Sequence, residues 1–110
     1  MTFVPDQGDI VWMDFDPQAG HEQAGRRPAV VLSPAAYNQR TGLMLCCPMA
    51  TKPKGNPWEV AISAAGNSVV LSDQIKSLDW TARHVEKKGT ATMVELSSVR
   101  KFARALAGQP

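Results

Sequence analysis

The polar segment from His21 to Pro28 carries the side chains in this sequence that are best suited to chemistry. A carboxylate (Glu22), an imidazole (His21) and two guanidinium groups (Arg26 and Arg27) stand close together along the chain. These groups are the parts that phosphoryl-transfer chemistry needs when no metal takes part. The sequence has no glycine-rich phosphate loop, no serine nucleophile elbow and no Cys/His spacing typical of a metal site. We therefore expect no cofactor and no metal.

Such a segment is suited to cutting RNA, because RNA supplies its own nucleophile. Attack of the 2′-hydroxyl on the adjacent phosphate needs a base, a cation for the charged pentacoordinate centre, and an acid for the leaving 5′-oxygen. Glu22 fits the base, since a free glutamate titrates near pH ~4.3 and is ionised at neutral pH. Arg27 fits the cation, because its planar fork grips phosphate oxygens in pairs. His21 can serve as base or acid, and no other candidate for the acid stands out.

A purely structural interpretation competes with this one and is favoured by residue types alone. Glu22 would then pair with Arg26 or Arg27 at the surface, which contributes only about 0–1 kcal/mol and no chemistry. His21 would be a solvent-facing loop residue. The three tryptophans are most simply core or interface residues, with RNA stacking as the alternative: Trp12, Trp58 and Trp80.

Short strands and one helix are expected to position this segment. Runs rich in β-branched and aromatic residues, separated by Gly, Pro and Asn, are typical of strands joined by loops. The predicted strands cover residues 10–15, 29–32, 43–49, 58–62 and 68–71, the last continuing through Ile75 and Leu78, with a final strand or hairpin between His84 and Thr92. The predicted connections are a flexible loop from Gln18 to Arg27, a second one over residues 33–42 and a basic loop from Thr51 to Pro57.

The chain is predicted to end in an amphipathic helix. Thr92 followed by Glu95 forms a capping box. Apolar residues then recur at helical spacing until Gly108: Leu96, Val99, Phe102, Ala103 and Leu106. Because strands and helices do not alternate, we expect a mainly β fold with a C-terminal helix, a small, mostly antiparallel barrel. At 110 residues, the chain fits one domain spanning residues 1–110.

Charge and composition point to a partner and a compartment. The first 22 residues hold five acidic and no basic side chains, whereas the remaining 88 hold all twelve Lys and Arg and five acidic ones. This basic excess is compatible with a polyanion, although solvated basic faces are common. No stretch is long and apolar enough for a membrane span, and residues 1–8 lack a signal-peptide pattern, so we expect a cytoplasmic protein. The adjacent Cys46 and Cys47 are predicted to be small buried side chains on opposite faces of a strand.

The chain closely resembles the MazF/PemK family of toxin endoribonucleases. The resemblance begins with the strings Gly8-Asp9-Ile10-Val11-Trp12-Met13-Asp14-Phe15-Asp16-Pro17 and Gly20-His21-Glu22-Gln23-Ala24-Gly25-Arg26-Arg27-Pro28-Ala29-Val30-Val31-Leu32-Ser33-Pro34. It resumes at Tyr37-Asn38, Thr41-Gly42, Pro48, Lys54-Gly55, Glu59-Val60, Leu71, Asp73-Gln74-Ile75-Lys76-Ser77 and Lys87-Lys88-Gly89-Thr90. It therefore covers nearly the whole chain in one register.

The resemblance implies a fold, an activity and partners. The fold would be an SH3-like (MazF/PemK/CcdB-type) barrel that acts as a homodimer, with single-stranded RNA in a groove across the two subunits. The family's E-Q-x-G-x-R-P loop maps its catalytic Glu and Arg onto Glu22 and Arg27, and cleavage would leave a 2′,3′-cyclic phosphate and a 5′-hydroxyl. The partner would be a MazE-like antitoxin that blocks the groove with an acidic disordered tail.

The same mapping assigns further residues and shows one departure. Many relatives place a hydroxyl residue, often Thr, where this chain has Ala50, so Thr51 becomes the candidate for the phosphate-contacting hydroxyl. A neighbouring strand residue faces the other way unless a bulge intervenes. The remaining implied RNA contacts are Phe15, His21, Gln23 and Gln74, with Lys52 and Lys54 on the phosphate backbone.

Two other functions compete with RNA cleavage. A related barrel is used by gyrase-poisoning toxins, which bind a protein and cleave nothing. Such toxins depend on the end of their final helix, and here that helix runs into Ala105 to Pro110 without an aromatic anchor. The third interpretation is an inactive RNA-binding module, for which Ala50 is the support.

Overall fold

The computed structural model describes residues 3–15 and 25–108. The candidates His21, Glu22 and Gln23 lie outside the described residues. The strands are β1 (Asp9–Asp14), β2 (Arg26–Val31), β3 (Leu43–Ala50), β4 (Glu59–Ala61), β5 (Val69–Leu71), β6 (Lys76–Asp79) and β7 (Glu86–Thr90). The helices are α1 (Ala35–Thr41), α2 (Met93–Leu106) and two short 3-10 turns, η2 (Ser63–Ala65) and η3 (Trp80–Ala82).

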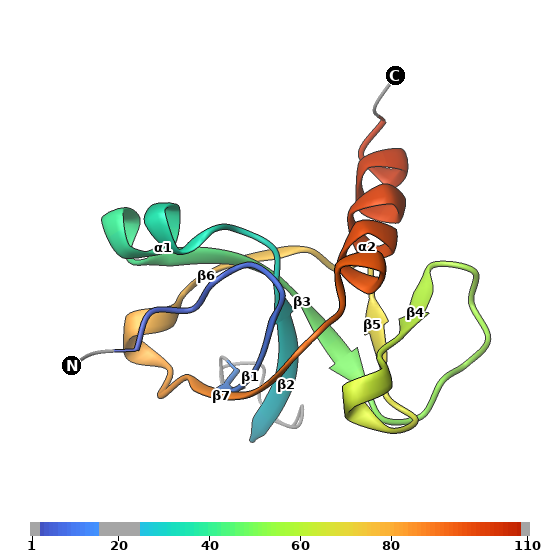
Figure 1. The fold of residues 1–110 in the computed structure, drawn as a ribbon, viewed down its shortest axis with the longest axis horizontal. Coiled ribbons are helices and arrows are strands. Elements are labelled where there is room, and N and C mark those ends of the chain that lie inside the picture. The colour runs from blue at the N-terminus through green and yellow to red at the C-terminus, as the bar shows by residue number, and fades with distance from the viewer. Residues whose placement is uncertain (1–2, 16–24, 109–110) are drawn as a thin grey trace.

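The strands form one antiparallel, strongly curved sheet, as Figure 1 shows. Its order is β4-β5-β3-β2-β1-β7, with β6 also paired to β3. The central strand β3 is long enough to pair with β6 along its first half and with β5 at its last two residues. The expected architecture, a mainly β, mostly antiparallel fold with a C-terminal helix, is confirmed.

The curved sheet buries apolar side chains on both of its faces. Ile10, Val30, Cys47 and Met49 belong to one core cluster, which α2 covers with Leu96 and Val99. The other cluster is made of the alternate residues of the same strands, Val11, Met13, Ala29, Val31, Met44 and Cys46. This alternation follows from the two-residue period of a strand. Cys46 and Cys47 are buried, free and on opposite faces, as predicted.

Helix α2 begins where its capping box predicts. The Thr92 hydroxyl accepts from the Glu95 backbone N–H at 3.1 Å, and the Glu95 carboxylate accepts from the Thr92 N–H at 2.8 Å. The same carboxylate accepts from the Ser63 N–H at 2.8 Å, which ties the helix to η2. A capping contact of this kind contributes about 1 kcal/mol. Within the described residues, no helix is long and apolar enough to cross a membrane.

The predicted connection over residues 33–42 is wrong in part, because it contains α1. The helix is short, and Gly42 ends it in the left-handed conformation (φ 75°). Its buried Asn38 donates to the carbonyl oxygens of Pro5 (2.8 Å) and Ser33 (3.0 Å). Asparagine is a poor helix former, so these tertiary contacts decide the conformation.

Two strand boundaries also differ from the prediction. Arg27 lies within β2, not in a loop, because its backbone pairs with Met13 of β1. The predicted continuation of β5 through Ile75 and Leu78 is interrupted: a turn after Leu71, closed by the Gln74 N–H at 3.1 Å from the Leu71 carbonyl, separates β5 from β6. Of the two alternatives for the end of the sheet, the single strand is confirmed, because β7 pairs with β1, with a register shift between Ile10 and Val11.

Candidate active site

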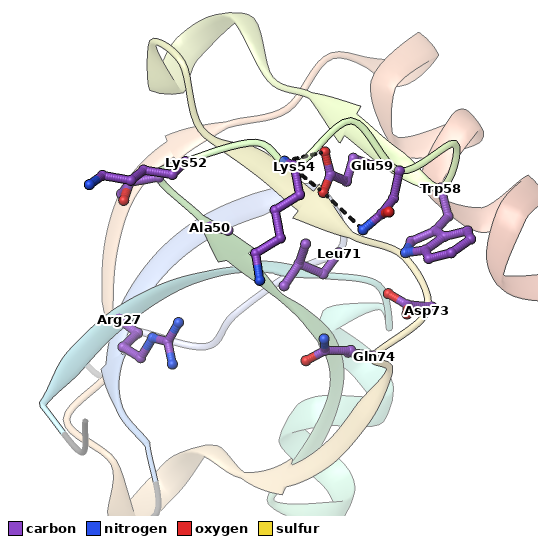
Figure 2. A pocket seen from close by; sticks show the side chains of 11 residues that line it. Arg27, Ala50, Lys52, Lys54, Trp58, Glu59, Leu71, Asp73 and Gln74 are labelled. Atoms are coloured by element: carbon purple, nitrogen blue, oxygen red, sulfur yellow. Dashed lines mark hydrogen bonds between the residues drawn. The ribbon is translucent and has the colours of Figure 1, made fainter. Parts of the chain in front are cut away.

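One open cavity of about 400 Å³ brings most of the described candidate residues together. Its walls come from β2, the end of β3, the loop before β4, β4 itself and the β5–β6 turn (Figure 2). Its lining residues are Arg27, Ala50, Thr51, Lys52, Lys54, Asn56, Trp58, Glu59, Leu71, Asp73 and Gln74. Of the predicted site residues, Arg27, Thr51, Lys52, Lys54 and Gln74 are therefore in one place.

Arg27 enters this cavity because of its position on β2. Its neighbours Ala29 and Val31 point into a core cluster, so the odd-numbered residues of β2 share one face. The Arg27 guanidinium carbon lies 5.7 Å from the centroid of the Phe15 ring, within the range of a cation–π contact. Phe15 is not a lining residue of the cavity, so its contact with the site is through the Arg27 guanidinium.

Arg26 points away from Arg27 and has other partners. Its guanidinium lies 3.1 Å from the Asp14 carboxylate and 3.2 Å from that of Glu86, and it donates to the His84 carbonyl at 2.8 Å. His84 Nδ1 in turn lies 2.8 Å from Asp14. The His84 hydrogen bond, together with Arg26, holds the pKa of Asp14 below its ordinary value of 3.8. This network occupies Arg26, so the two neighbouring arginines have different tasks.

The basic loop before β4 contributes two lysines with different orientations. Figure 2 shows the Lys54 side chain extending over Ala50 and Leu71 toward the space that Arg27 faces. The Lys52 side chain runs away from this cluster in the same view. Lys54 thus adds a second cation to the Arg27 side of the cavity, whereas Lys52 stands at its rim.

Ala50 and Thr51 both line the cavity, although they are adjacent in sequence. Strand alternation would separate them, but β3 ends at Ala50, whose partner Val69 is the last in the β3–β5 register. Beyond the strand end, the side-chain direction of Thr51 is no longer fixed by the pleat. Thr51 is therefore exposed at the cavity wall without the bulge that the sequence argument required.

The cavity also contains residues to which the sequence analysis assigned no role. Asp73 reaches it with Gln74 because the turn between β5 and β6 projects from the sheet. Asn56 and Glu59 come from the loop and from β4. Trp58, predicted as a core or interface residue with RNA stacking as the alternative, is half-buried at the cavity wall. The sequence signal that could have placed the loop residues at the site is the pair of prolines around a glycine in residues 53–57, which is typical of a structured turn. The Trp80 prediction holds, since its ring packs on the core and its Nε1 donates to the Asn38 carbonyl at 2.9 Å.

The two cysteines are buried and free. Burial raises the pKa of both Cys46 and Cys47 to about 12, so neither is a reactive thiolate at neutral pH. Among the described residues, no three His, Cys, Asp or Glu side chains are grouped as a metal ion would require.

Comparisons with known proteins agree with this architecture. The profile of the PemK-like, MazF-like toxins of type II toxin–antitoxin systems matches residues 6–107. The endoribonuclease toxin MazF of Escherichia coli strain K12 is 50% identical over 107 residues, covering 96% of each chain.

Solved structures give the same result. A MazE–MazF complex from Deinococcus radiodurans contains a chain with 49% identity and a TM-score of 0.91, covering 99% of this chain and 100% of that one. A crystal structure of MazF from the same organism matches with 49% identity and a TM-score of 0.89, covering 98% of this chain and 100% of that one. The chain therefore belongs to the PemK-like, MazF-like family of toxins of type II toxin–antitoxin systems.

Proposed function

We propose that this toxin is a sequence-specific endoribonuclease that cleaves single-stranded mRNA without a metal ion and so inhibits translation and growth. The observation that carries the proposal is the placement of Arg27 and Lys54 at one cavity beside Thr51 and Gln74. Two cations with hydrogen-bonding side chains around them suit a phosphodiester and its flanking nucleotides. The curated relative at 50% identity is an endoribonuclease.

The reaction follows from what each group can do. The 2′-oxygen attacks the adjacent phosphorus while Glu22 takes the 2′-hydroxyl proton. Negative charge grows on the phosphate oxygens, and Arg27 stabilises it with paired N–H donors. The bond from phosphorus to the 5′-oxygen breaks, and that oxygen acquires a proton. The products are a 2′,3′-cyclic phosphate and a 5′-hydroxyl, with no other reactant consumed.

Single-stranded RNA is the proposed substrate because its bases can be separated and read individually. Gln74 and Asp73 supply amide and carboxylate groups at the wall opposite Arg27. Phe15, His21, Gln23 and Lys52 complete the proposed RNA contacts, with Lys52 at the rim where a backbone phosphate would pass.

The activity is tested by mapping the ends that the purified protein creates. A long single-stranded RNA is incubated with the protein in EDTA, and new ends are located by primer extension. We expect cuts at a short sequence with 5′-hydroxyl ends, and a loss of at least ~10²-fold in Arg27→Ala if Arg27 stabilises the transition state. Arg40→Ala, which removes an exposed arginine of α1, is the matched control and should cut normally.

Two outcomes would contradict this mechanism. Wild-type rates in Arg27→Ala would remove Arg27 from the reaction. A loss in Glu22→Ala of ~10²-fold or more is expected for a general base, whereas a loss below about threefold would reassign Glu22 to a structural role.

The proposal includes partners and a place of action. We propose that the toxin works as a homodimer in the cytoplasm and is neutralised by a MazE-like antitoxin with an acidic disordered tail. The Deinococcus radiodurans relative was solved as a MazE–MazF complex, and the basic residues that follow residue 22 suit an acidic partner. A folded protein that cuts no RNA would favour the alternative, a toxin that binds a protein such as gyrase.

A further inference from the structure

Glu59 is a carboxylate inside a cavity that is otherwise basic on its Arg27 side. It stands at the start of β4, paired with Leu71 of β5. A negative charge at this place works against the binding of a polyanion. A structural role for the Glu59 carboxylate would explain why a negative charge stands in this cavity.

The hydrogen bonds of Glu59 all lead to one short stretch of the loop before it. Its carboxylate accepts from the Lys54 N–H at 3.2 Å to each oxygen and from the Asn56 side-chain amide at 3.4 Å (dashed in Figure 2). It also accepts from the Gly55 N–H at 3.0 Å. The loop is closed by the Glu59 N–H, which donates to the Asn56 carbonyl at 3.1 Å. The carboxylate thus satisfies consecutive backbone donors that would otherwise need water.

The backbone at this point needs such an anchor. Gly55 has a left-handed conformation (φ 84°), which residues with a side chain rarely adopt, and the chain turns at residues 57–58 just after it. A surface loop with few buried contacts is held mainly by hydrogen bonds of this kind. Lys54 directly precedes Gly55, and its side chain extends over the cavity floor formed by Ala50 and Leu71 (Figure 2).

We infer that Glu59 is a positioning residue that fixes the Lys54–Asn56 turn and thereby directs the Lys54 ammonium at a backbone phosphate of the RNA. The inference rests on the proposed function, because it assumes that RNA occupies this cavity. Glu59 does not exchange protons in the reaction: its oxygens are directed at the turn's N–H groups and not at the Arg27 side of the cavity.

Glu59 should affect RNA binding in two opposite ways. Its negative charge repels RNA, whereas its hydrogen bonds hold the turn that positions Lys54. Glu59→Ala and Glu59→Gln both remove the negative charge, and on charge alone both should bind RNA more tightly. Only Glu59→Gln keeps a carbonyl oxygen that can accept from the turn. We expect Glu59→Ala to bind more weakly by about fivefold near 0.1 M salt, and Glu59→Gln to bind at least as well as the wild type.

The experiment measures binding of a 2′-deoxy oligonucleotide, which cannot be cut, across a series of salt concentrations. For one lost phosphate contact on a single strand, the slope of log K against log salt should fall in magnitude by about 0.7 in Glu59→Ala, as it should in Lys54→Ala. The double variant should lose no more than Lys54→Ala alone, because both changes remove the same contact. The kcat of Glu59→Gln, measured at saturating RNA, separates a positioning role from a role in proton transfer.

A second readout does not depend on RNA. Hydrogen exchange at the Lys54 and Gly55 amides should accelerate in Glu59→Ala, while amides of β3 remain protected as the control for folding. Unchanged exchange, tighter binding by Glu59→Ala or additive losses in the double variant would overturn the inference. A large fall of kcat in Glu59→Gln would also overturn it and make Glu59 a proton-transfer group. If the wild type neither binds nor cuts RNA, the proposed function fails, and this role of Glu59 fails with it.

Discussion

Ala50 is the last residue of β3 and faces the cavity at the position where relatives often carry a threonine. Its methyl group cannot donate a hydrogen bond to a phosphate. Thr51 follows at the same wall, exposed and released from strand alternation. At the scale of single residues, Thr51 therefore stays the candidate for the hydroxyl that would contact a phosphate.

A substitution pair tests whether this shifted hydroxyl is used. Thr51→Val preserves the shape and removes the hydroxyl, and we predict about a tenfold slower single-turnover cleavage, the usual cost of one hydrogen bond to a charged group. Adding Ala50→Thr should restore part of the rate. Cleavage by Thr51→Val at the wild-type rate would show that neither position supplies a required hydroxyl.

At the scale of elements, the ends of three strands, β1, β2 and β7, meet around Arg26. Its guanidinium joins the end of β1 through Asp14 to the start of β7 through Glu86. Arg83 strengthens the junction by donating to the Asp14 carbonyl at 3.2 Å. Because Asp14 and Arg26 face each other in the β1–β2 register, the junction sets the position from which Arg27 enters the cavity on the other face.

This junction predicts a specific dependence of stability on acid. The pKa of Asp14 is lowered in the folded state, first by the His84 hydrogen bond and then by Arg26. The ionised Asp14 carboxylate therefore stabilises the folded state above the unfolded pKa of about 4, and this stabilisation is lost as the pH falls through the lower pKa of the folded state. Asp14→Asn should lower the melting temperature at pH 5, and its difference from the wild type should shrink below pH 4.

His84→Ala provides the companion variant for this measurement. It removes the largest cause of the Asp14 shift, so its acid dependence should resemble that of Asp14→Asn. If the difference in melting temperature between the wild type and Asp14→Asn stays constant from pH 5 down to pH 3, the stability of the junction does not depend on the charge of Asp14.

At the scale of the whole molecule, large apolar side chains remain exposed beside β3 and β6. Leu43 and Leu45 point the same way from β3, each more than a third exposed, and Ile75 precedes the strand that pairs with them. A small domain gains stability when such surface is covered by a second copy. This surface supports the proposed homodimer.

The dimer is tested by mass and by concentration. Light scattering on a sizing column should give twice the chain mass of 11.9 kDa. The melting temperature should rise with protein concentration, as it does when association stabilises the folded state. A melting temperature that does not change with protein concentration, together with the mass of one chain, would contradict the proposed homodimer and indicate a monomer.

The sequence by itself determined the elements whose signals are local. Runs of β-branched, aromatic and other apolar residues marked β1 and β3, and the two-residue period of a strand placed Cys46 and Cys47 on opposite faces. Both signals come from neighbouring residues. The capping box at Thr92 and Glu95 marked the start of α2 for the same reason. The grouping of Arg27 with Lys54 and Gln74 followed from the family resemblance.

Only the tertiary structure decided the features that depend on distant partners. Helix α1 forms because Asn38 bonds to Pro5, which lies far away in sequence. The β5–β6 interruption, which carries Gln74 into the cavity, forms because both strands must pair with separate parts of β3. Glu59 acquired a role only when β4 placed its carboxylate against the turn that holds Lys54. Hydrogen bonds between remote residues leave no periodic pattern in the sequence, so the fold had to supply them.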